Sequence, residues 1–590
     1  MLSIKSSIRL LTIVFLLAIS GHASAQSLGF DSREATIATV HHALYTGLSS
    51  CREVVSSFLT RIEAHNPKIN AIIALNPAAL ATADALDEAL AQGNATGPLF
   101  CVPVLLKDNF DFAGLPTTGG NLGLASLRPA ASAPAVAALQ RAGAVVLGKA
   151  NLHELALEGL SVSSLGGQTR NPYDASRTPG GSSGGSGAAV AAGFAVLATG
   201  TDTVNSLRSP ASANNLFSVR PTRGLVSRSG VMPISYTQDA AGVIARSLED
   251  VAAALTVMAG VGYDVDGDNA TALIPESSVG VDYGAELAAA SSTGLDGVRL
   301  GLLEPFFNRT ASPENDPVNE AMDAVVGALE AAGATVVRIN DTALFNVTSI
   351  AAELDTQRFE YRESMDAYLQ NPGRASNSSS SSPRTLADIY ATNNTSGSGA
   401  GNGSFVVIPA QYEYVTTSLR SSTANATYAA VQAGVRNLTL ALASTLSAHR
   451  VSALIYPEQR NLVVPIGSAS QAGRNGILAA LTGSPVVTVP VGFSEATEEA
   501  PLGVPIGMEI LGRPWAERGL LAVAKGVCAA LGPRARRRSP EWAKGFVEAK
   551  EYESVPVTEN LALMFTLIDK RSEKKLKRAW RQSLLTFCDE

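Results

Sequence analysis

The stretch TPGGSSGGSGAAVAAGFAVLATGTDTVNSLR, residues 178–208, decides the fold and carries three serines of interest. Ser182 and Ser183 stand in a glycine-rich turn, and Ser206 follows the motif GTDT. Between them lies a helix-like run of Ala, Gly and Val with no charged residue before Asp202. Such a run is typical of a buried element, and we expect it to hold the serines at its two ends.

One lysine, Lys107, lies upstream in the otherwise apolar run VPVLLKD. Burial among Val and Leu side chains disfavours the ammonium form and lowers the pKa of a lysine. A serine hydroxyl is a weak nucleophile until a neighbour takes its proton, and a neutral lysine can do so. Lys107, Ser182 and Ser206 are therefore candidate members of a proton relay for acyl transfer.

Further motifs follow in order along the chain. They are GKANLHE at 148–154, RPTRGLVSRSG at 220–230, SYTQDAAGVIARSLED at 235–250, NGILAALTGSPVVTVPVGF at 475–493 and PIGMEILGRPW at 505–515. With the lysine run and the serine stretch, they resemble the amidase signature family over about residues 30 to 530. Members of this family hydrolyse carboxamides through a Ser–cis-Ser–Lys triad.

The resemblance implies an α/β fold, with one large domain at residues 26–530 and a central mixed, twisted β-sheet covered by helices on both faces. The alternation of short apolar runs with Ala-rich segments independently favours such a covered sheet. Residues 33–90 have helical spacing. Strands are expected at 102–107, 144–148, 298–303, 335–338, 452–456 and 485–491.

The resemblance also implies a role for each member of the relay. Ser206 would be the nucleophile, Ser182 the bridging serine and Lys107 the base. A cis peptide bond would join Gly181 to Ser182. An acyl-enzyme on Ser206 would form as ammonia or an amine leaves, and water would then release the acid.

The segment before the nucleophile departs from the family pattern. The family usually has two glycines there, whereas this chain has Val204 and Asn205. Asparagine best imitates glycine at positive φ, so we expect a glycine-like backbone at Asn205. Backbone N–H groups of this segment would stabilise the oxyanion. The candidate oxyanion and substrate-binding residues are Thr203, Val204, Asn205 and Ser183.

Residues 1–25 have the parts of a secretory signal peptide. Lys5 and Arg9 precede an apolar run, and Ala23-Ser24-Ala25 resembles a cleavage site. The apolar run is too short to span a bilayer comfortably, and no later segment has about 20 uninterrupted large apolar residues. We therefore expect a secreted, extracellular protein without a membrane span.

N-glycosylation sequons support export and favour a eukaryotic, fungal-type glycoprotein over a bacterial exported one. Most of them lie between residues 269 and 437. The sequon asparagines are Asn94, Asn269, Asn308, Asn340, Asn346, Asn377, Asn393, Asn394, Asn402, Asn425 and Asn437.

Two other functions fit parts of the chain. The run GGSSG at 180–184 also fits the G-x-S-x-G turn of serine esterases. Ser182 would then be the nucleophile, with His449, the one histidine after it, as the base. Alternatively, Val204 and Asn205 favour an inactive amidase-fold glycoprotein that only binds a ligand. A transfer-RNA amidotransferase subunit of the same family is disfavoured, because the signal peptide would place it in the wrong compartment.

Composition limits partners and cofactors. The 590 residues carry a formal net charge of −7, which argues against a nucleic-acid partner. The four cysteines form no CxxC motif, and neither a metal nor an organic cofactor is implied. Cys51 and Cys101 either form a disulfide or remain buried thiols. The expected partner is a small-molecule amide, whose identity stays open along with the oligomeric state.

Two segments stand apart from these motifs. Residues 373–404 are rich in Ser, Asn and Gly, which predicts a low-complexity, glycosylated loop that either borders the substrate pocket or acts as a spacer. Residues 531–590 form a basic C-terminal tail of unknown role. A polyanion-binding appendage, a solvated helix and a mispredicted C-terminus are the alternatives for this tail.

Charged clusters elsewhere are better explained by structure than by ligand binding. Lys149 is followed by alanine where a phosphate-binding loop needs Ser or Thr, so a structural lysine on a strand is predicted. The run from Asp264 to Asp268 lacks the glycine and glutamate of a calcium loop and predicts a solvated turn. Arg208, Arg220 and Arg223 are expected to pair with carboxylates such as Asp202 rather than with substrate.

Overall fold

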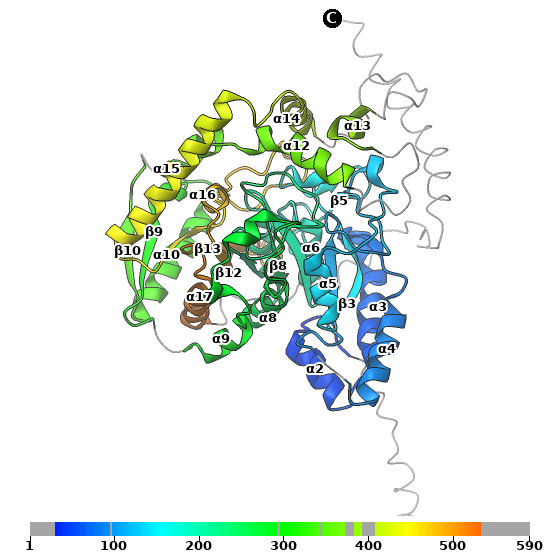
Figure 1. Cartoon of the computed structure of the whole chain (residues 1–590). Coiled ribbons are helices and arrows are strands. Elements are labelled where there is room, and N and C mark those ends of the chain that lie inside the picture. The colour runs from blue at the N-terminus through cyan, green and yellow to red at the C-terminus, as the bar shows by residue number, and fades with distance from the viewer. Residues whose placement is uncertain are drawn as a thin grey trace, which may run out of the picture. The chain divides into compact units, whose positions relative to one another are not determined.

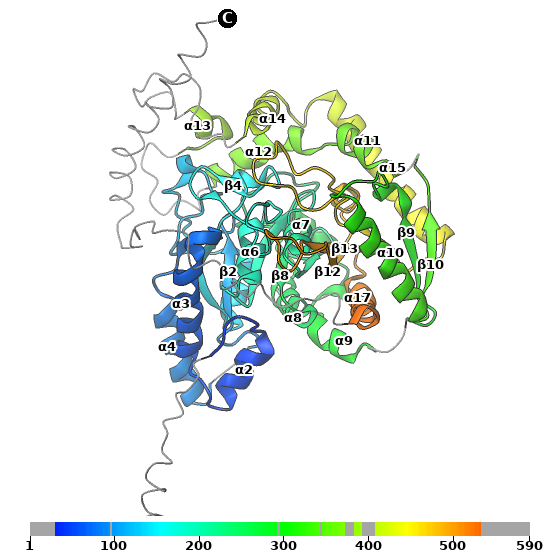
Figure 2. The ribbon, with the colours of Figure 1, turned by 180° about the vertical axis from the view of Figure 1, so that it is seen from behind.

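The computed structural model describes residues 30–94, 97–291, 295–342, 345–371, 383–391 and 408–532. The expected signal peptide, most of the expected loop at 373–404 and the tail from residue 533 lie outside these residues. The described chain belongs to one compact unit that carries all the elements below (Figures 1 and 2).

An eleven-stranded mixed β-sheet forms the centre of this unit, in the order β1-β3-β2-β6-β8-β7-β12-β13-β11-β9-β10, and β4 and β5 form a separate hairpin. Strands β2 and β6 are parallel neighbours, whereas β6 and β8 are antiparallel. The strands are β1 Ile72–Leu75, β2 Pro103–Lys107, β3 Val145–Ala150, β4 Val162–Ser163, β5 Gly167–Gln168, β6 Leu197–Asp202, β7 Phe217–Arg220, β8 Ala240–Ala245, β9 Arg299–Leu303, β10 Thr335–Ile339, β11 Ala453–Pro457, β12 Val486–Phe493 and β13 Pro505–Leu511.

Helices cover both faces of the sheet, as the complete burial of its central strands β2, β6 and β8 requires. Helices α6 and α7 pack together on the centre of the sheet, and α8 and α17 pack on its strands β7, β8, β12 and β13. The helices are α2 Ile37–Tyr45, α3 Cys51–Ile69, α4 Ala79–Ala91, α5 Pro134–Arg141, α6 Gly184–Ala191, α7 Arg208–Ala213, α8 Leu248–Ala259, α9 Tyr283–Ala289, α10 Asp316–Ala331, α11 Val347–Glu353, α12 Gln357–Gln370, α13 Leu386–Ala391, α14 Pro409–Leu419, α15 Ala426–Ala448, α16 Ile477–Thr482 and α17 Glu517–Leu531.

The six strands expected from the sequence are all present, as β2, β3, β9, β10, β11 and β12. The helix-like run after Ser183 is only half helical, because α6 ends at Ala191 and the chain then enters β6. Hydrogen bonding to strands on both sides turns Leu197–Asp202 into a central strand despite its Gly and Ala content.

The expected loop at 373–404 is wrong for residues 386–391, which form helix α13. Leu386 and Ile389, one helical turn apart, are fully buried in a cluster with Tyr361 and Met365 of α12. Tertiary packing of this apolar pair outweighs the polar composition of the surrounding sequence. Figure 1 shows α12, α13 and α14 grouped at the top of the view.

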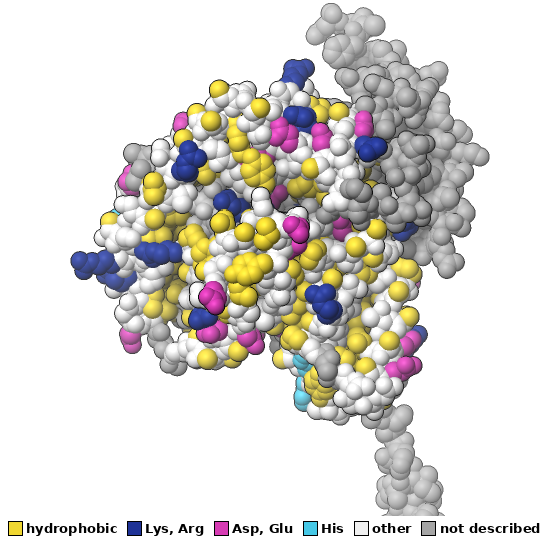
Figure 3. Space-filling view, viewed as in Figure 1, with side chains coloured by type: hydrophobic (Ala, Val, Ile, Leu, Met, Phe, Trp, Pro, Cys, Tyr) yellow, Lys and Arg dark blue, Asp and Glu magenta, His cyan; other side chains and the backbone are white. Residues whose placement is uncertain are grey.

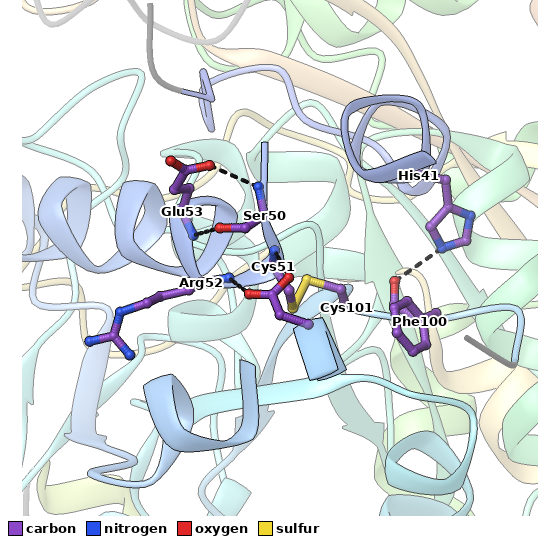
Figure 4. The surroundings of a disulfide bond; sticks show 8 residues. His41, Ser50, Cys51, Arg52, Glu53, Phe100 and Cys101 are labelled. Carbon is purple, nitrogen blue, oxygen red and sulfur yellow. Dashed lines mark hydrogen bonds between the residues drawn. A yellow bond between two sulfur atoms is a disulfide. The ribbon is translucent and has the colours of Figure 1, made fainter. Parts of the chain in front are cut away.

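Cys51 and Cys101 form a disulfide, so the first of the two alternatives for these cysteines is observed. It joins the first turn of α3 to the segment that leads into β2, the strand that ends at Lys107. Helix α3 begins with a capping box in which Ser50 Oγ accepts from the Glu53 N–H and Glu53 accepts from the Ser50 N–H (Figure 4). The disulfide therefore ties two well-defined elements together.

The surface is modestly charged, in line with a chain of which 16% is Asp, Glu, Lys or Arg. On the face shown in Figure 3, charged side chains of both signs stand among hydrophobic and uncharged ones. Among the described helices, none has the length and apolar character that a membrane crossing would need.

Candidate active site

Lys107 stands at the carboxyl end of β2 with its side chain fully buried. Its Nζ donates to Ser182 Oγ at 2.8 Å and to Thr201 Oγ1 at 2.7 Å. Its backbone N–H donates to Thr199 Oγ1. Because side chains alternate along a strand, Thr199 and Thr201 of β6 face the lysine together. The sheet thus supplies both the position of Lys107 and its hydrogen-bond partners.

Burial lowers the pKa of Lys107 from 10.5 to about 7, and the more distant charges of Asp202 and Asp239 oppose this shift. Removing an ammonium group from water disfavours its charged form. A substantial fraction of this lysine is then neutral near pH 7 and able to accept a proton.

Ser182 follows the expected cis peptide bond from Gly181. The turn lies very close to its neighbours: a Cβ on Gly185 would approach Asn151 O to 2.1 Å. Ser183 turns its Oγ to Thr201 O, and its backbone N–H donates to Ser206 O at 3.3 Å. This last bond brings the serine turn and the segment of Ser206 side by side.

Hydrogen bonds hold the segment that leads into Ser206 from several directions. Thr203 Oγ1 donates to Asp239 Oδ1 at 2.7 Å, and the Gln238 side chain donates to Thr203 O. The Arg208 guanidinium donates to Val204 O. With these carbonyls bound to protein, the backbone N–H groups of residues 203–206 have no hydrogen-bond acceptor among the described residues. Such N–H groups are suited to a developing oxyanion.

Asn205 does not have the glycine-like backbone that its sequence position predicted, because its φ is not among the positive values of the described chain. Its side chain is fully buried, and Nδ2 donates to Glu458 Oε1 at 2.8 Å. A long-range side-chain contact, rather than backbone freedom, therefore accounts for asparagine at this position.

A buried ion network lies beneath the same segment. Asp202 accepts from Arg208 at 3.0 Å and from Arg220 at 2.6 Å, and Arg208 also donates to Glu509 at 2.6 Å. All four side chains are fully buried. The prediction that these arginines pair with carboxylates is confirmed for Arg208 and Arg220. Arg223 instead donates to the carbonyl of Thr237.

A cavity of about 480 Å³ adjoins this cluster. Asn109, Thr201 and Thr203 belong to its lining, and Asn109 also donates to the Thr201 hydroxyl that Lys107 contacts. Val231, Met232 and Ile234 form an apolar wall, and all three are buried residues. The cavity therefore offers partly apolar space beside Thr201 and Thr203, whereas Lys107, Ser182 and Ser206 are not among its lining residues.

The sequence pointed to neither Thr201 nor Asp239 nor Glu458 as a site residue. Because side chains alternate between the two faces of a strand, the GTDT motif could have predicted that Thr201 lies on the face of β6 that contacts Lys107. No local sequence pattern identifies Asp239 or Glu458 as site residues. Their hydrogen bonds to Thr203 and Asn205 join residues that are 36 and 253 positions apart in the sequence.

Two of the other charged clusters have structural roles. Lys149 lies on β3 and forms a buried ion pair with Asp108 at 2.9 Å, as the predicted structural lysine. The solvated turn predicted around Asp264 is wrong for Asp268, which is buried and paired with Arg228 at 2.6 Å. The guanidinium of Arg228 offsets the free-energy cost of burying the Asp268 carboxylate.

The sequence model of the Amidase family matches residues 53–521, a span that contains every site residue described above. The chain belongs to the amidase family. The solved peptide amidase of Stenotrophomonas maltophilia is 34% identical, with a TM-score of 0.73 over 86% of this chain and 98% of that one. The amidase fold, with one large mixed sheet and covering helices, is thus confirmed.

Several curated relatives of this chain are glutamyl-tRNA(Gln) amidotransferase subunits A. The subunit of Myxococcus xanthus is 34% identical over 502 residues, which cover 82% of this chain and 94% of the relative. The match to the subunit of Halorhodospira halophila is 39% identical but covers only 52% of this chain and 60% of that relative.

Proposed function

We propose that this chain hydrolyses the C–N bond of a carboxamide, with Ser206 as nucleophile, Ser182 as bridging serine and Lys107 as base. The observation that carries the proposal is the 2.8 Å hydrogen bond from Lys107 Nζ to Ser182 Oγ in a fully buried position. Ser206, at 8% exposure, is the more accessible of the two serines.

In the proposed reaction, neutral Lys107 takes a proton from Ser182, which takes one from Ser206. The Ser206 oxygen attacks the amide carbon, and backbone N–H groups of residues 203–206 stabilise the oxyanion, an interaction worth about 3–4 kcal/mol for each donor. The relay returns the proton to the leaving nitrogen as the C–N bond breaks. Water then attacks the acyl-enzyme through the same relay, and the acid leaves with Ser206 restored.

The similarity to a peptide amidase along nearly all of that protein's length supports an amide, rather than an ester, as substrate. A second candidate is the reaction of an amidotransferase subunit, which the names of the curated relatives favour. The amide nitrogen would then pass to an acceptor instead of leaving as free ammonia. The proposed export of this chain disfavours the second candidate.

We further propose that the chain is a secreted glycoprotein of fungal type. The disulfide between Cys51 and Cys101 supports an oxidising compartment, and the signal-like residues 1–25 support export. Seven sequon asparagines lie in the described residues, and all have exposed or half-buried side chains: Asn94, Asn269, Asn308, Asn340, Asn346, Asn425 and Asn437. A culture-medium fraction that lacks the protein, or a secreted form whose mass is unchanged by glycosidase, would contradict this proposal.

The catalytic assignment is tested with a panel of amides and esters, with ammonia or amine release as the readout. We expect Ser206→Ala to abolish hydrolysis and to prevent labelling by a fluorophosphonate probe. Ser182→Ala and Lys107→Ala should each reduce the rate by several orders of magnitude, with losses that do not add. The matched control is Ser209→Ala, in the neighbouring turn of α7, which should stay active.

The same experiment distinguishes the alternative functions from one another. Probe labelling at Ser182 together with an inactive His449→Ala variant would support the esterase. Amide binding without turnover by the unmodified protein would support the inactive ligand-binding protein. Transfer of the amide nitrogen to an acceptor, with no release of ammonia or amine from the panel, would support the amidotransferase subunit.

A further inference from the structure

The cavity beside Lys107 has an unbalanced set of charged groups. Its described lining contains three carboxyl groups, those of Asp239, Asp266 and Asp268, against the single guanidinium of Arg228. Its lining includes Thr201, which accepts from Lys107 Nζ, and Thr203, which lies three residues before Ser206. An amide that reacts at Ser206 would therefore have this charge environment beside it.

Arg228 is already committed to partners in the protein. Its Nε and Nη2 atoms donate to the two carboxylate oxygens of Asp268, at 2.7 and 2.6 Å. Its Nη1 donates to the carbonyls of Tyr236 and Asp239, at 2.8 and 3.2 Å. The bidentate pair neutralises the guanidinium, so Arg228 has little attraction left for a substrate carboxylate.

The remaining carboxyl groups give the cavity lining a negative formal charge. Asp239 is half-buried and accepts from Thr203 Oγ1 and from the backbone N–H groups of Ile234 and Ser235. Asp266 is exposed at the rim and has no ion-pair partner among the described residues. Both carboxyl groups line the cavity, while Lys107 must be neutral to act as a base.

We propose that this site selects carboxamides whose acyl part is neutral or cationic and partly apolar, and rejects those with a carboxylate near the reacting amide. This inference rests on the proposed amide hydrolysis. A carboxylate entering the cavity would lose water without gaining a cation, and like charges placed together are costly. The wall of Val231, Met232 and Ile234 suits an apolar group, and Asp266 suits an ammonium group.

The test compares three N-acetylated α-amides that differ mainly in side-chain charge, those of methionine, lysine and glutamate. With the full-length protein, we expect kcat/KM for the glutamate amide to be at least about tenfold below that for the methionine amide. The lysine amide should match or exceed the methionine amide. A glutamate amide that reacts as fast as the methionine amide would overturn the inference.

Two variants test whether Asp266 causes the discrimination against the glutamate amide. Asp266→Asn should raise the glutamate-to-methionine ratio of kcat/KM several-fold. Glu320→Gln, the same charge change at an exposed residue of α10 outside the cavity, should leave that ratio unchanged. If this ratio changes equally in both variants, or in neither, Asp266 does not cause the selectivity and the inference is overturned.

Binding separates this inference from the proposed reaction. The affinities of the same three amides for the Ser206→Ala protein are measured by calorimetry. The order lysine, methionine, glutamate, from tight to weak, supports the charge selection even if the unmodified protein hydrolyses none of them. The reverse order refutes it whether or not hydrolysis occurs.

Discussion

Asn205 Nδ2 donates a 2.8 Å hydrogen bond to Glu458 Oε1, and this bond joins the residue before the proposed nucleophile to the residue after β11. Both side chains are fully buried. Gly476 makes room for the contact, because a Cβ at that position would lie 2.4 Å from the Asn205 Cβ. The segment before Ser206, which we propose binds the oxyanion, is thereby anchored to the opposite half of the sheet.

The first prediction concerns this anchor. Asn205→Gly should lower kcat/KM by about tenfold or more, because it leaves a buried acceptor of Glu458 unpaired and loosens the oxyanion segment, a loss of about 1–3 kcal/mol. Steady-state kinetics on a variant shown to be folded by circular dichroism measures the effect.

The matched control is Asn215→Gly, where the backbone has φ +56° and accepts glycine without strain. It should retain activity. If Asn205→Gly were as fast as the unmodified protein, the side chain at 205 would have no anchoring role, and a backbone role would be the better explanation.

The second prediction concerns the proton on Glu458. Burial, reinforced by the nearby charge of Glu509, raises the pKa of Glu458 above its ordinary value of 4.5. The stability contributed by the bound proton is fully present below the unfolded-state pKa and is lost as pH rises through the raised folded-state pKa. The free energy of unfolding should therefore decline as the pH rises from the unfolded-state pKa to the folded-state pKa of Glu458.

Glu458→Gln removes that titration while keeping an acceptor for Asn205. We expect its urea unfolding free energy to decline less than that of the unmodified protein between about pH 5 and about pH 9. Parallel curves for the two proteins over that range would show that Glu458 does not gain a proton on folding.

The third prediction follows from the pKa of Lys107, which burial lowers to about 7. Only the neutral amine can accept a proton, so kcat/KM should rise with pH through about 7 and then level off. Lys107→Arg should be inactive at every pH tested, because a guanidinium stays protonated in proteins. A flat profile across neutral pH, or an active arginine variant, would contradict a lysine base.

The fourth prediction concerns the buried ion network. Asp202→Asn removes a charge shared by Arg208 and Arg220 and should lower the free energy of unfolding by about 3–5 kcal/mol. Asp84→Asn is the matched control, because its pair with Arg52 is about half exposed. Breaking that surface pair should cost about 0–1 kcal/mol. Similar losses in the two variants would show that burial does not strengthen the Asp202 network.

Strand prediction succeeded where apolar runs are rich in Val, Ile and Leu, as in Val145–Ala150 and Val486–Phe493. It missed Leu197–Asp202 and Ala240–Ala245, whose Ala, Gly and Thr residues have weak strand preference. These two strands pair with each other along their whole length in the middle of the sheet. Their strand conformation depends on neighbours that local sequence does not reveal.

The chain by itself determined the family and the candidate relay, because Lys107, Ser182 and Ser206 each lie in a short motif whose meaning is local. Only the tertiary structure decided how Asn205 is used and how the cavity is charged. Glu458 is 253 residues from Asn205, and Asp268 is 40 from Arg228. Periodicity and composition report the backbone preferences of neighbouring residues, whereas these pairs exist only after the folded chain has closed and buried them together.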